Sequence, residues 1–152
     1  AQALINDPKI LILDEPTSGL DPAERAKFRN IISSLSDGRI ILLSTHIVSD
    51  VEYIADRIVL MKNGQAVLED AGEDICNNIS VMVWECGVPQ READRLAAEH
   101  VITNLHNTHD GVQLRIVSEI RPTPDAVSVE PKLEDLYLYY FRQELKNEPD
   151  KA

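Results

Sequence analysis

The chain has 152 residues, of which 43% are hydrophobic, and a formal net charge of −11. This length suits one ordinary domain, or a truncated domain with a small appendage, and the hydrophobic content excludes wholesale disorder. The acidic balance argues against nucleic acid as the main partner and against electrostatic docking on anionic lipid, because both present negative charge.

Residues 1–70 alternate between strand and helix patterns, which predicts an α/β sheet. Residues 1–5 have the character of a helix interior without a cap, so we expect the natural protein to begin further upstream. The first two strands are unbroken apolar runs, which is typical of a parallel sheet buried on both faces. The expected elements are a strand at 9–13, a helix from Asp21 to about Gly38, a strand at 40–43, a short helix at 48–54, and strands at 57–61 and 65–68 joined by the Asn63-Gly64 turn.

The composition changes near residue 71, and the remainder predicts a smaller α+β region. We therefore divide the chain into residues 1–70 and 71–152. Trp84 is expected to pack in a core or between domains. Cys76 and Cys86 match no metal-binding spacing and are interpreted as free thiols of a cytosolic protein. The expected elements are a strand at 79–85, an amphipathic helix at 89–100, strands at 101–107 and 112–117, a rigid linker at 121–125 and a final helix at 132–145.

The candidate chemistry lies in residues 10–22, Ile-Leu-Ile-Leu-Asp-Glu-Pro-Thr-Ser-Gly-Leu-Asp-Pro. Asp14 follows a predicted strand at the usual ligand position of open α/β folds, and a carboxylate there can hold a hydrated Mg²⁺. Glu15 is placed to orient or deprotonate an attacking water. Two solvated acids at a strand end are the simpler interpretation, but the nine contiguous specified positions from Asp14 to Pro22 favour the functional one.

His46 is the second catalytic candidate, since it follows Ser44-Thr45 at the end of the next predicted strand. A lone histidine after an apolar strand is more often structural. This one, however, ends the strand that follows the Asp-Glu strand, and an imidazole can hydrogen-bond a phosphate oxygen near neutral pH. The remaining histidines have no such context and are interpreted as surface or turn residues: His100, His106 and His109.

Residues 13–22 closely resemble the Walker B segment and D-loop of ATP-binding-cassette (ABC) ATPases, and residues 44–46 are similar to the H-loop of that family. The resemblance covers about residues 1–78. It implies an α/β fold in which residues 1–70 are the C-terminal half of a P-loop NTPase parallel sheet with helices. Residues 71–152 are then an accessory α+β extension. The implied cofactors are ATP and Mg²⁺.

The resemblance also implies roles for individual residues. It makes Asp14 the residue that binds Mg²⁺ through water, Glu15 the general base or water-positioning residue, and His46 the residue that bonds the γ-phosphate. In the family, the D-loop crosses a nucleotide-sandwich dimer and touches the site of the other subunit. That role falls here to Ser18, Gly19 and Asp21.

Residues 131–138 resemble the closing helix of ABC ATPases that serve ABC-2-type export permeases. A generic amphipathic helix on an accessory domain is the alternative. The family implies an exporter ATPase subunit whose partners are a transmembrane permease and a second ATPase subunit, with no nucleic acid. It also implies a cytoplasmic protein, peripheral on the inner face of the cell membrane and without direct membrane insertion. In agreement, no apolar run approaches the roughly 18 residues of a bilayer span, and we identify no secretory signal.

Two parts of a working ABC ATPase do not occur in residues 1–152, namely a Gly-x-x-x-x-Gly-Lys-Ser/Thr phosphate loop and a Leu-Ser-Gly-Gly signature. We therefore expect the chain to be a fragment and the intact protein to be a Mg²⁺-dependent ATPase. The isolated chain is expected to hydrolyse no ATP. An incomplete sheet is also expected to expose apolar edges.

Two other functions stay open. The first is a non-catalytic ABC-like module that dimerises or regulates, and the intact Asp14, Glu15 and His46 stand against it. The second is a soluble ABC ATPase of DNA repair or translation, which the net charge of −11 and the lack of a basic stripe disfavour.

Overall fold

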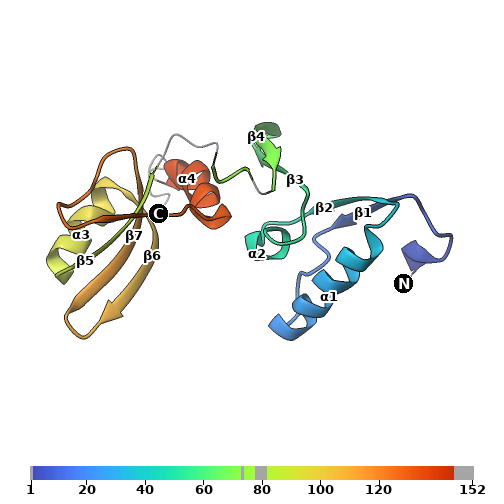
Figure 1. Cartoon of the computed structure of the whole chain (residues 1–152), viewed down its shortest axis with the longest axis horizontal. Helices are drawn as coiled ribbons and strands as arrows, with labels where there is room; N and C mark the ends of the chain where they lie inside the picture. The colour runs from blue at the N-terminus through green and yellow to red at the C-terminus, as the bar shows by residue number, and fades with distance from the viewer. Residues whose placement is uncertain (1, 73, 78–81, 146–152) are drawn as a thin grey trace, which may run out of the picture. The chain divides into compact units, whose positions relative to one another are not determined.

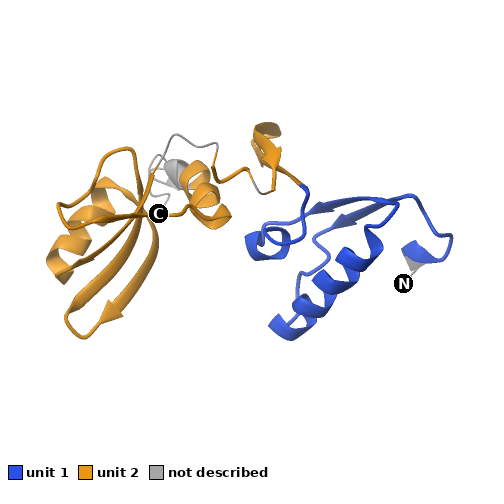
Figure 2. Ribbon diagram, in the orientation of Figure 1, with its two compact units in different colours: residues 1–56 blue, residues 57–152 orange. Residues whose placement is uncertain are grey.

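The structure is a computed structural model that describes residues 2–72, 74–77 and 82–145. The chain divides into two compact units, residues 1–56 and residues 57–152 (Figure 2). The hairpin at 57–71 thus groups with the second unit; the two domains expected at 1–70 and 71–152 stay a prediction. None of the helices in the described ranges has the length and apolar character needed to cross a membrane.

The first unit contains two parallel strands with helices around them (Figure 1). Strand β1 pairs with β2 in a register that runs from Ile10 opposite Ile40 to Asp14 opposite Ser44. Figure 1 shows α1 beside this pair of strands. The elements in chain order are the 3₁₀ helix η1 (Gln2–Leu4), β1 (Ile10–Asp14), α1 (Pro22–Leu35), β2 (Ile40–Ser44) and α2 (Val48–Val51).

Helix α1 begins where the sequence predicts it. The Asp21 side chain accepts a hydrogen bond from the Glu24 backbone N–H at 2.8 Å, and the Glu24 carboxylate accepts one from the Asp21 N–H at 3.2 Å. Pro22 occupies the first helical position, where its missing N–H costs nothing. The helix ends at Leu35, before the expected Gly38, which lies in the turn that follows. α2 likewise ends before residue 54.

The expectation that β1 and β2 are buried on both faces is wrong. Leu11 on β1 and Ile32 on α1 are buried, at 4% and 7% exposure. The alternate strand residues are open to solvent, with exposures of 60–69% for Ile10, Ile12, Ile40 and Leu42. Side chains of a strand alternate between two faces, so α1 accounts for one face only. Among the described residues of this unit, no second layer covers the other face.

The second unit opens with the predicted hairpin. β3 (Arg57–Lys62) and β4 (Gln65–Ala71) pair antiparallel, with a bulge between Leu60 and Met61. Asn63 and Gly64 both have positive φ, 51° and 76°, which the tight turn between right-twisted strands requires. The local dipeptide therefore suffices to specify this turn.

A four-stranded antiparallel sheet with two helices forms the rest of the second unit (Figure 1). Its strands lie in the order β6-β7-β5-β8. The expected strand at 79–85 is found from Met82 onward, and its first part lies outside the described residues. β8 was not expected. The elements are β5 (Met82–Val88), α3 (Gln90–Glu99), β6 (Val101–Thr108), β7 (Gly111–Ser118), β8 (Val127–Val129) and α4 (Leu133–Leu145).

The two helices of this unit cover opposite faces of the sheet. Leu114 on β7 belongs to the larger core cluster, together with Ala93 and Leu96 of α3. Val117, three residues further along β7 and therefore on the other face, belongs to a second cluster against which Tyr139 of α4 packs. Unlike the β1–β2 pair, this sheet has apolar side chains buried on both faces.

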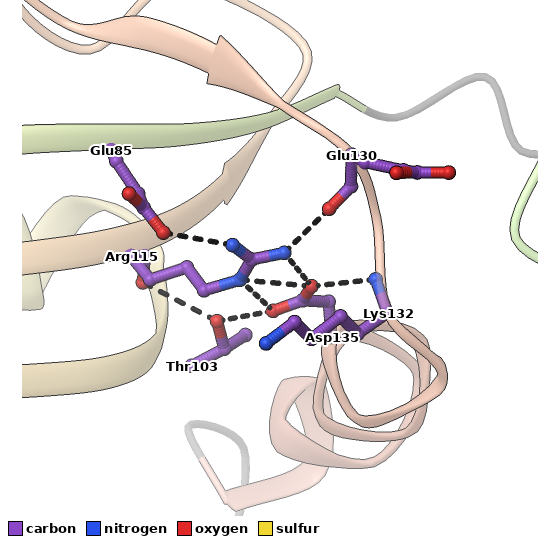
Figure 3. Close-up of polar contacts among 6 residues, drawn as sticks. All are labelled: Glu85, Thr103, Arg115, Glu130, Lys132 and Asp135. Atoms are coloured by element: carbon purple, nitrogen blue, oxygen red, sulfur yellow. Dashed lines mark hydrogen bonds and ion pairs between the residues drawn. The ribbon is translucent and has the colours of Figure 1, made fainter. Parts of the chain in front are cut away.

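Arg115 of β7 and Asp135 of α4 form a buried ion pair between the sheet and the helix (Figure 3). Their side chains are 12% and 3% exposed. The guanidinium donates from Nε to both carboxylate oxygens, at 3.0 and 3.1 Å, and from Nη2 to Oδ2 at 2.7 Å. Such multidentate, charge-assisted bonds fix the orientation of α4 on its strand.

Four further hydrogen bonds saturate this pair (Figure 3). Asp135 also accepts from the Thr103 hydroxyl at 2.5 Å and from the Lys132 N–H at 2.9 Å. Arg115 also donates to the Glu85 carboxylate at 2.9 Å and to the Glu130 carbonyl at 2.6 Å. Burial by itself raises the pKa of Asp135, but the hydrogen bonds from Arg115, Thr103 and Lys132 outweigh it and hold that pKa below its ordinary value. The pair is therefore ionised, satisfied and structural.

Candidate functional site

The carboxyl ends of β1 and β2 bring the predicted site residues together. The strands are parallel, so Asp14 at the end of β1 lies opposite Ser44 at the end of β2. The Ser44 hydroxyl donates a hydrogen bond to Oδ1 of Asp14, which is itself exposed. An apolar strand thus delivers one carboxylate to the edge of the sheet, as the sequence predicts.

Glu15 adopts a backbone conformation that is uncommon for a residue with a side chain. Its φ is +44°, in the left-handed region, while its N–H still bonds the Ser44 carbonyl at 2.9 Å. A non-glycine residue in this region is a strained one that persists only when its surroundings hold it, and such residues concentrate at functional sites. The left-handed conformation, which Asp7 and Asn63 share, here falls at the position that the sequence predicts to be catalytic.

Glu15 and His46 are in direct contact. Oε1 of Glu15 lies 2.9 Å from the ring Nδ1 of His46 and accepts a hydrogen bond from the His46 backbone N–H at 3.1 Å. Thr45 donates weakly to the other carboxylate oxygen, at 3.5 Å. The two side chains stay accessible, 38% exposed for Glu15 and 68% for His46. Two catalytic candidates 31 residues apart therefore form one open carboxylate–imidazole pair.

The segment after Glu15 is a pair of consecutive turns. The Ser18 N–H bonds the Glu15 carbonyl, and the Leu20 N–H bonds the Thr17 carbonyl, both at 3.1 Å. Gly19 has a φ of +80°, which glycine adopts at no steric cost. Ser18 and Gly19 are exposed, whereas the Asp21 carboxylate caps α1. Of the three predicted D-loop residues, the structure gives Asp21 a role within the chain itself.

The structure shows a buried polar contact near the site that the sequence does not predict. Thr17 is fully buried and donates from its hydroxyl to Oδ2 of Asp50 at 2.5 Å. Asp50 is 1% exposed, and its other oxygen accepts from Nη1 of Arg29 at 3.3 Å. Thr17 and Asp50 are 33 residues apart, and no sequence pattern indicates a buried polar contact over that separation. The Thr17–Asp50 hydrogen bond therefore cannot be predicted from the sequence.

The residues at the strand ends fit a magnesium ion held in the way that nucleotide enzymes hold it. No group of three or more potential metal ligands occurs among the described residues. Mg²⁺ is commonly bound by one or two carboxylates together with waters and substrate phosphates, and not by an all-protein cage. Asp14 and the Ser44 hydroxyl supply hard oxygen ligands of that kind at one sheet edge. Asp14 can therefore serve as one ligand of the ion among several.

The packing predicted for Trp84 is confirmed. Trp84 is half-buried and packs against the larger core cluster, and its Nε1 donates to the Ser118 carbonyl at 3.2 Å. Neither cysteine forms a disulfide, and burial raises the pKa of the Cys86 thiol. His106 and His109 are exposed, and His100 is half-buried at the end of α3.

Comparison with known proteins finds ATP-binding proteins of export and transport systems. The chain is 34% identical over 157 aligned positions, 97% of its length, to Nod factor export ATP-binding protein I of Rhizobium meliloti, of which the match covers 47%. It is 51% identical over 70 residues to a lantibiotic transport ATP-binding protein of Streptococcus pyogenes, covering 45% of this chain and 31% of that one. A third relative is an uncharacterized ABC transporter ATP-binding protein of Synechocystis, 46% identical over 79 residues, which are 51% of this chain and 22% of the relative.

A scan against protein-family models finds no match. The chain spans about half of the rhizobial protein and less of the other two.

Proposed function

The chain belongs to the ABC transporter ATP-binding proteins, to which it is homologous over 97% of its length, and on this premise we propose that it is part of the ATP-hydrolysing subunit of an exporter. Two relatives are named for the export of Nod factor and the transport of lantibiotics. The observation that carries the proposal is the open contact between Glu15 and His46 at the sheet edge beside Asp14. A carboxylate, an imidazole and a hard metal ligand are part of what hydrolysis of the β–γ phosphoanhydride bond of ATP requires.

We assign a separate role to each of the three residues. Asp14 holds Mg²⁺ through water, and the ion, when bound, neutralises charge on the phosphates. Glu15 orients the attacking water and accepts its proton. His46 donates to a phosphate oxygen.

The exposed sheet face supports a larger parallel sheet in the intact protein. Four large aliphatic side chains of β1 and β2 are open on one face, which is unfavourable in water. A P-loop NTPase core buries its central parallel strands on both faces. We propose that the missing layer and the phosphate loop belong to a part of the protein outside residues 1–152. The isolated chain is then inactive as an ATPase, and residues 1–70 form the C-terminal half of the core.

The proposed partners are a transmembrane permease and a second ATPase subunit. Ser18 and Gly19, exposed in the turn after Glu15, are suited to contact the second subunit, because their backbone is accessible. Asp21 contributes by starting α1 at the end of that turn. The subunit is peripheral on the inner face of the cell membrane and is held there by the permease. ATP closes the dimer and hydrolysis reopens it.

The experiment that tests this proposal is ATP hydrolysis by the complete protein that carries this chain, with Glu15→Gln as the variant. The amide cannot accept a proton, so we expect kcat to fall by about 100-fold or more while ATP still binds. The matched control is Glu69→Gln, the same change at an exposed glutamate of β4 that bonds Arg57. Wild-type turnover in Glu15→Gln would contradict the assignment.

A further inference from the structure

The segments that carry Glu15 and His46 are joined at two places, and only one of them is at the surface. The first is the Glu15–His46 contact itself. The second is the hydrogen bond from Thr17, two residues after Glu15, to Asp50, four residues after His46. Thr17 and Asp50 are 0% and 1% exposed. The surface contact therefore has a buried counterpart that joins the same two segments.

The buried hydrogen bond between Thr17 and Asp50 opposes movement of the turn after Glu15 relative to α2. A buried carboxylate is costly unless each oxygen has a partner. Here the Thr17 hydroxyl bonds Oδ2 at 2.5 Å and Arg29 bonds Oδ1 at 3.3 Å. Moving the turn after Glu15 away from α2 would leave the Asp50 charge without its short hydrogen bond. The protein interior thus opposes such a movement.

Glu15 needs such an anchor. With φ at +44° it is in a conformation that a glutamate does not hold by its own preference. Its own carboxylate contacts are exposed and so compete with water. Thr17 is the first fully buried side chain after it in the chain. The strained backbone is therefore held by β1 on one side and by Thr17 on the other.

We propose that Thr17 and Asp50 are positioning residues, whose buried hydrogen bond holds the turn after Glu15 against α2 and so keeps the Glu15 carboxylate in contact with His46. Neither residue touches substrate. The effect on hydrolysis rests on the function proposed above, whereas the effect on the Glu15–His46 contact does not. The two can therefore be tested separately.

The first test uses the 152-residue chain and no nucleotide. In Thr17→Val the shape of the side chain is kept and the hydroxyl is lost. We expect the His46 backbone N–H, which bonds Glu15, to exchange with solvent about tenfold faster by nuclear magnetic resonance. The Glu24 N–H, which bonds the Asp21 cap, keeps its rate as an internal control. Thr17→Ser retains the hydroxyl and restores the His46 rate.

Equal acceleration at His46 and Glu24 would show that Thr17 only stabilises the unit, and no acceleration would show that it does not hold the contact; either result overturns the proposal.

Asp50→Asn is the second variant. It keeps the size of the side chain but loses the charge that both Thr17 and Arg29 contact, and we expect the same selective acceleration at His46.

The second test uses ATP hydrolysis by the complete protein. We expect Thr17→Val to lower kcat by roughly 10- to 100-fold with KM for ATP unchanged, because a displacement of the water-orienting group affects the reaction and not binding. Thr17→Ser restores kcat. A Thr17→Val enzyme with wild-type kcat overturns the catalytic consequence. If the wild-type protein itself does not hydrolyse ATP, the proposed function fails, and the exchange experiment still decides the positioning claim.

Discussion

Each of the two units holds one carboxylate against one basic side chain, and the two pairs differ in almost every physical respect. Asp135 and Arg115 in the second unit are 3% and 12% exposed and share three hydrogen bonds. Glu15 and His46 in the first unit are 38% and 68% exposed. Nδ1 of the imidazole contacts Glu15, and the second ring nitrogen, Nε2, takes no part in that contact. The Arg115–Asp135 pair makes hydrogen bonds with its protein surroundings on both sides. The Glu15–His46 pair is accessible and can bond a further group.

The surroundings of the two pairs differ in the same sense. The sheet around Arg115 buries apolar side chains on both faces, with Leu114 on one face at 0% exposure and Val117 on the other at 5%. The β1–β2 sheet below Glu15 leaves one apolar face open. A closed core with a saturated ion pair is what stability alone requires. The Glu15–His46 pair is accessible, the Glu15 backbone is left-handed, and one face of the β1–β2 sheet is uncovered. These features fit the proposal that another part of the protein completes the site.

The largest expected effect on stability comes from the saturated pair. Asp135→Asn leaves Arg115 buried without its charge partner, which we expect to lower the free energy of unfolding of the second unit by about 3–5 kcal/mol. Urea denaturation followed by the fluorescence of Trp84, the one tryptophan of the sequence, measures this unit. Glu15→Gln is the matched carboxylate-to-amide change in the first unit; followed by circular dichroism, which reports both units, it should change stability by about 0.5 kcal/mol at most. Comparable losses in both variants would remove the distinction between the pairs.

A slightly smaller effect is expected from the apolar residues. Leu114→Ala removes a fully buried side chain of β7 and should cost about 2–5 kcal/mol in the same denaturation experiment. Ile12→Ser, on the open face of β1 at 69% exposure, should cost far less when unfolding of the first unit is followed by circular dichroism. It should also reduce self-association of the 152-residue chain, which light scattering measures. A large loss of stability in Ile12→Ser would mean that this face is covered in solution.

The smallest expected effect is on the pH dependence of stability. The pKa of Asp135 is lower in the folded unit than its ordinary value of 3.8, so the unfolded state binds the proton more readily. The resulting stabilisation is complete above the ordinary value and is lost as the pH falls through the lower, folded one. We expect the urea midpoint reported by Trp84 to decrease below about pH 5. Asp135→Asn should flatten that decrease, and Glu69→Gln at an exposed ion pair should not. An unchanged slope in Asp135→Asn would contradict the ionised, satisfied pair.

Local signals predicted most of the secondary structure. Asp21, Pro22 and Glu24 form a capping box over three residues, and Asn63-Gly64 is a complete turn signal. The structure reproduces both because the contacts involved are between near neighbours. β8 was missed because a three-residue strand, Val127–Val129, is too short for a period of two to be recognised. The predicted helix at 48–54 is longer than α2, which ends at Val51, because apolar residues continue beyond that point.

The site was predicted as a set of residues but not as a structure. Asp14, Glu15 and His46 follow from the end of an apolar strand and from the family motif, and parallel pairing of β1 with β2 brings them together. The left-handed backbone of Glu15 and the burial of Thr17 and Asp50 were not accessible. Nor was the pairing of Arg115 with Asp135. Which polar side chains are buried is decided by tertiary contacts, which the spacing of residues along the chain does not encode.

The most direct measurement of the central claim, that the chain holds one part of an ATP-hydrolysis site, is Mg²⁺-dependent ATP turnover by the complete protein and by the 152-residue chain side by side. The account predicts turnover by the complete protein that Glu15→Gln abolishes, and none by the isolated chain. Mg²⁺-dependent turnover by the isolated chain, lost in its own Glu15→Gln variant, would contradict the claim that the phosphate-binding part lies elsewhere. A complete protein that binds ATP without hydrolysing it would contradict the role of the Glu15–His46 pair.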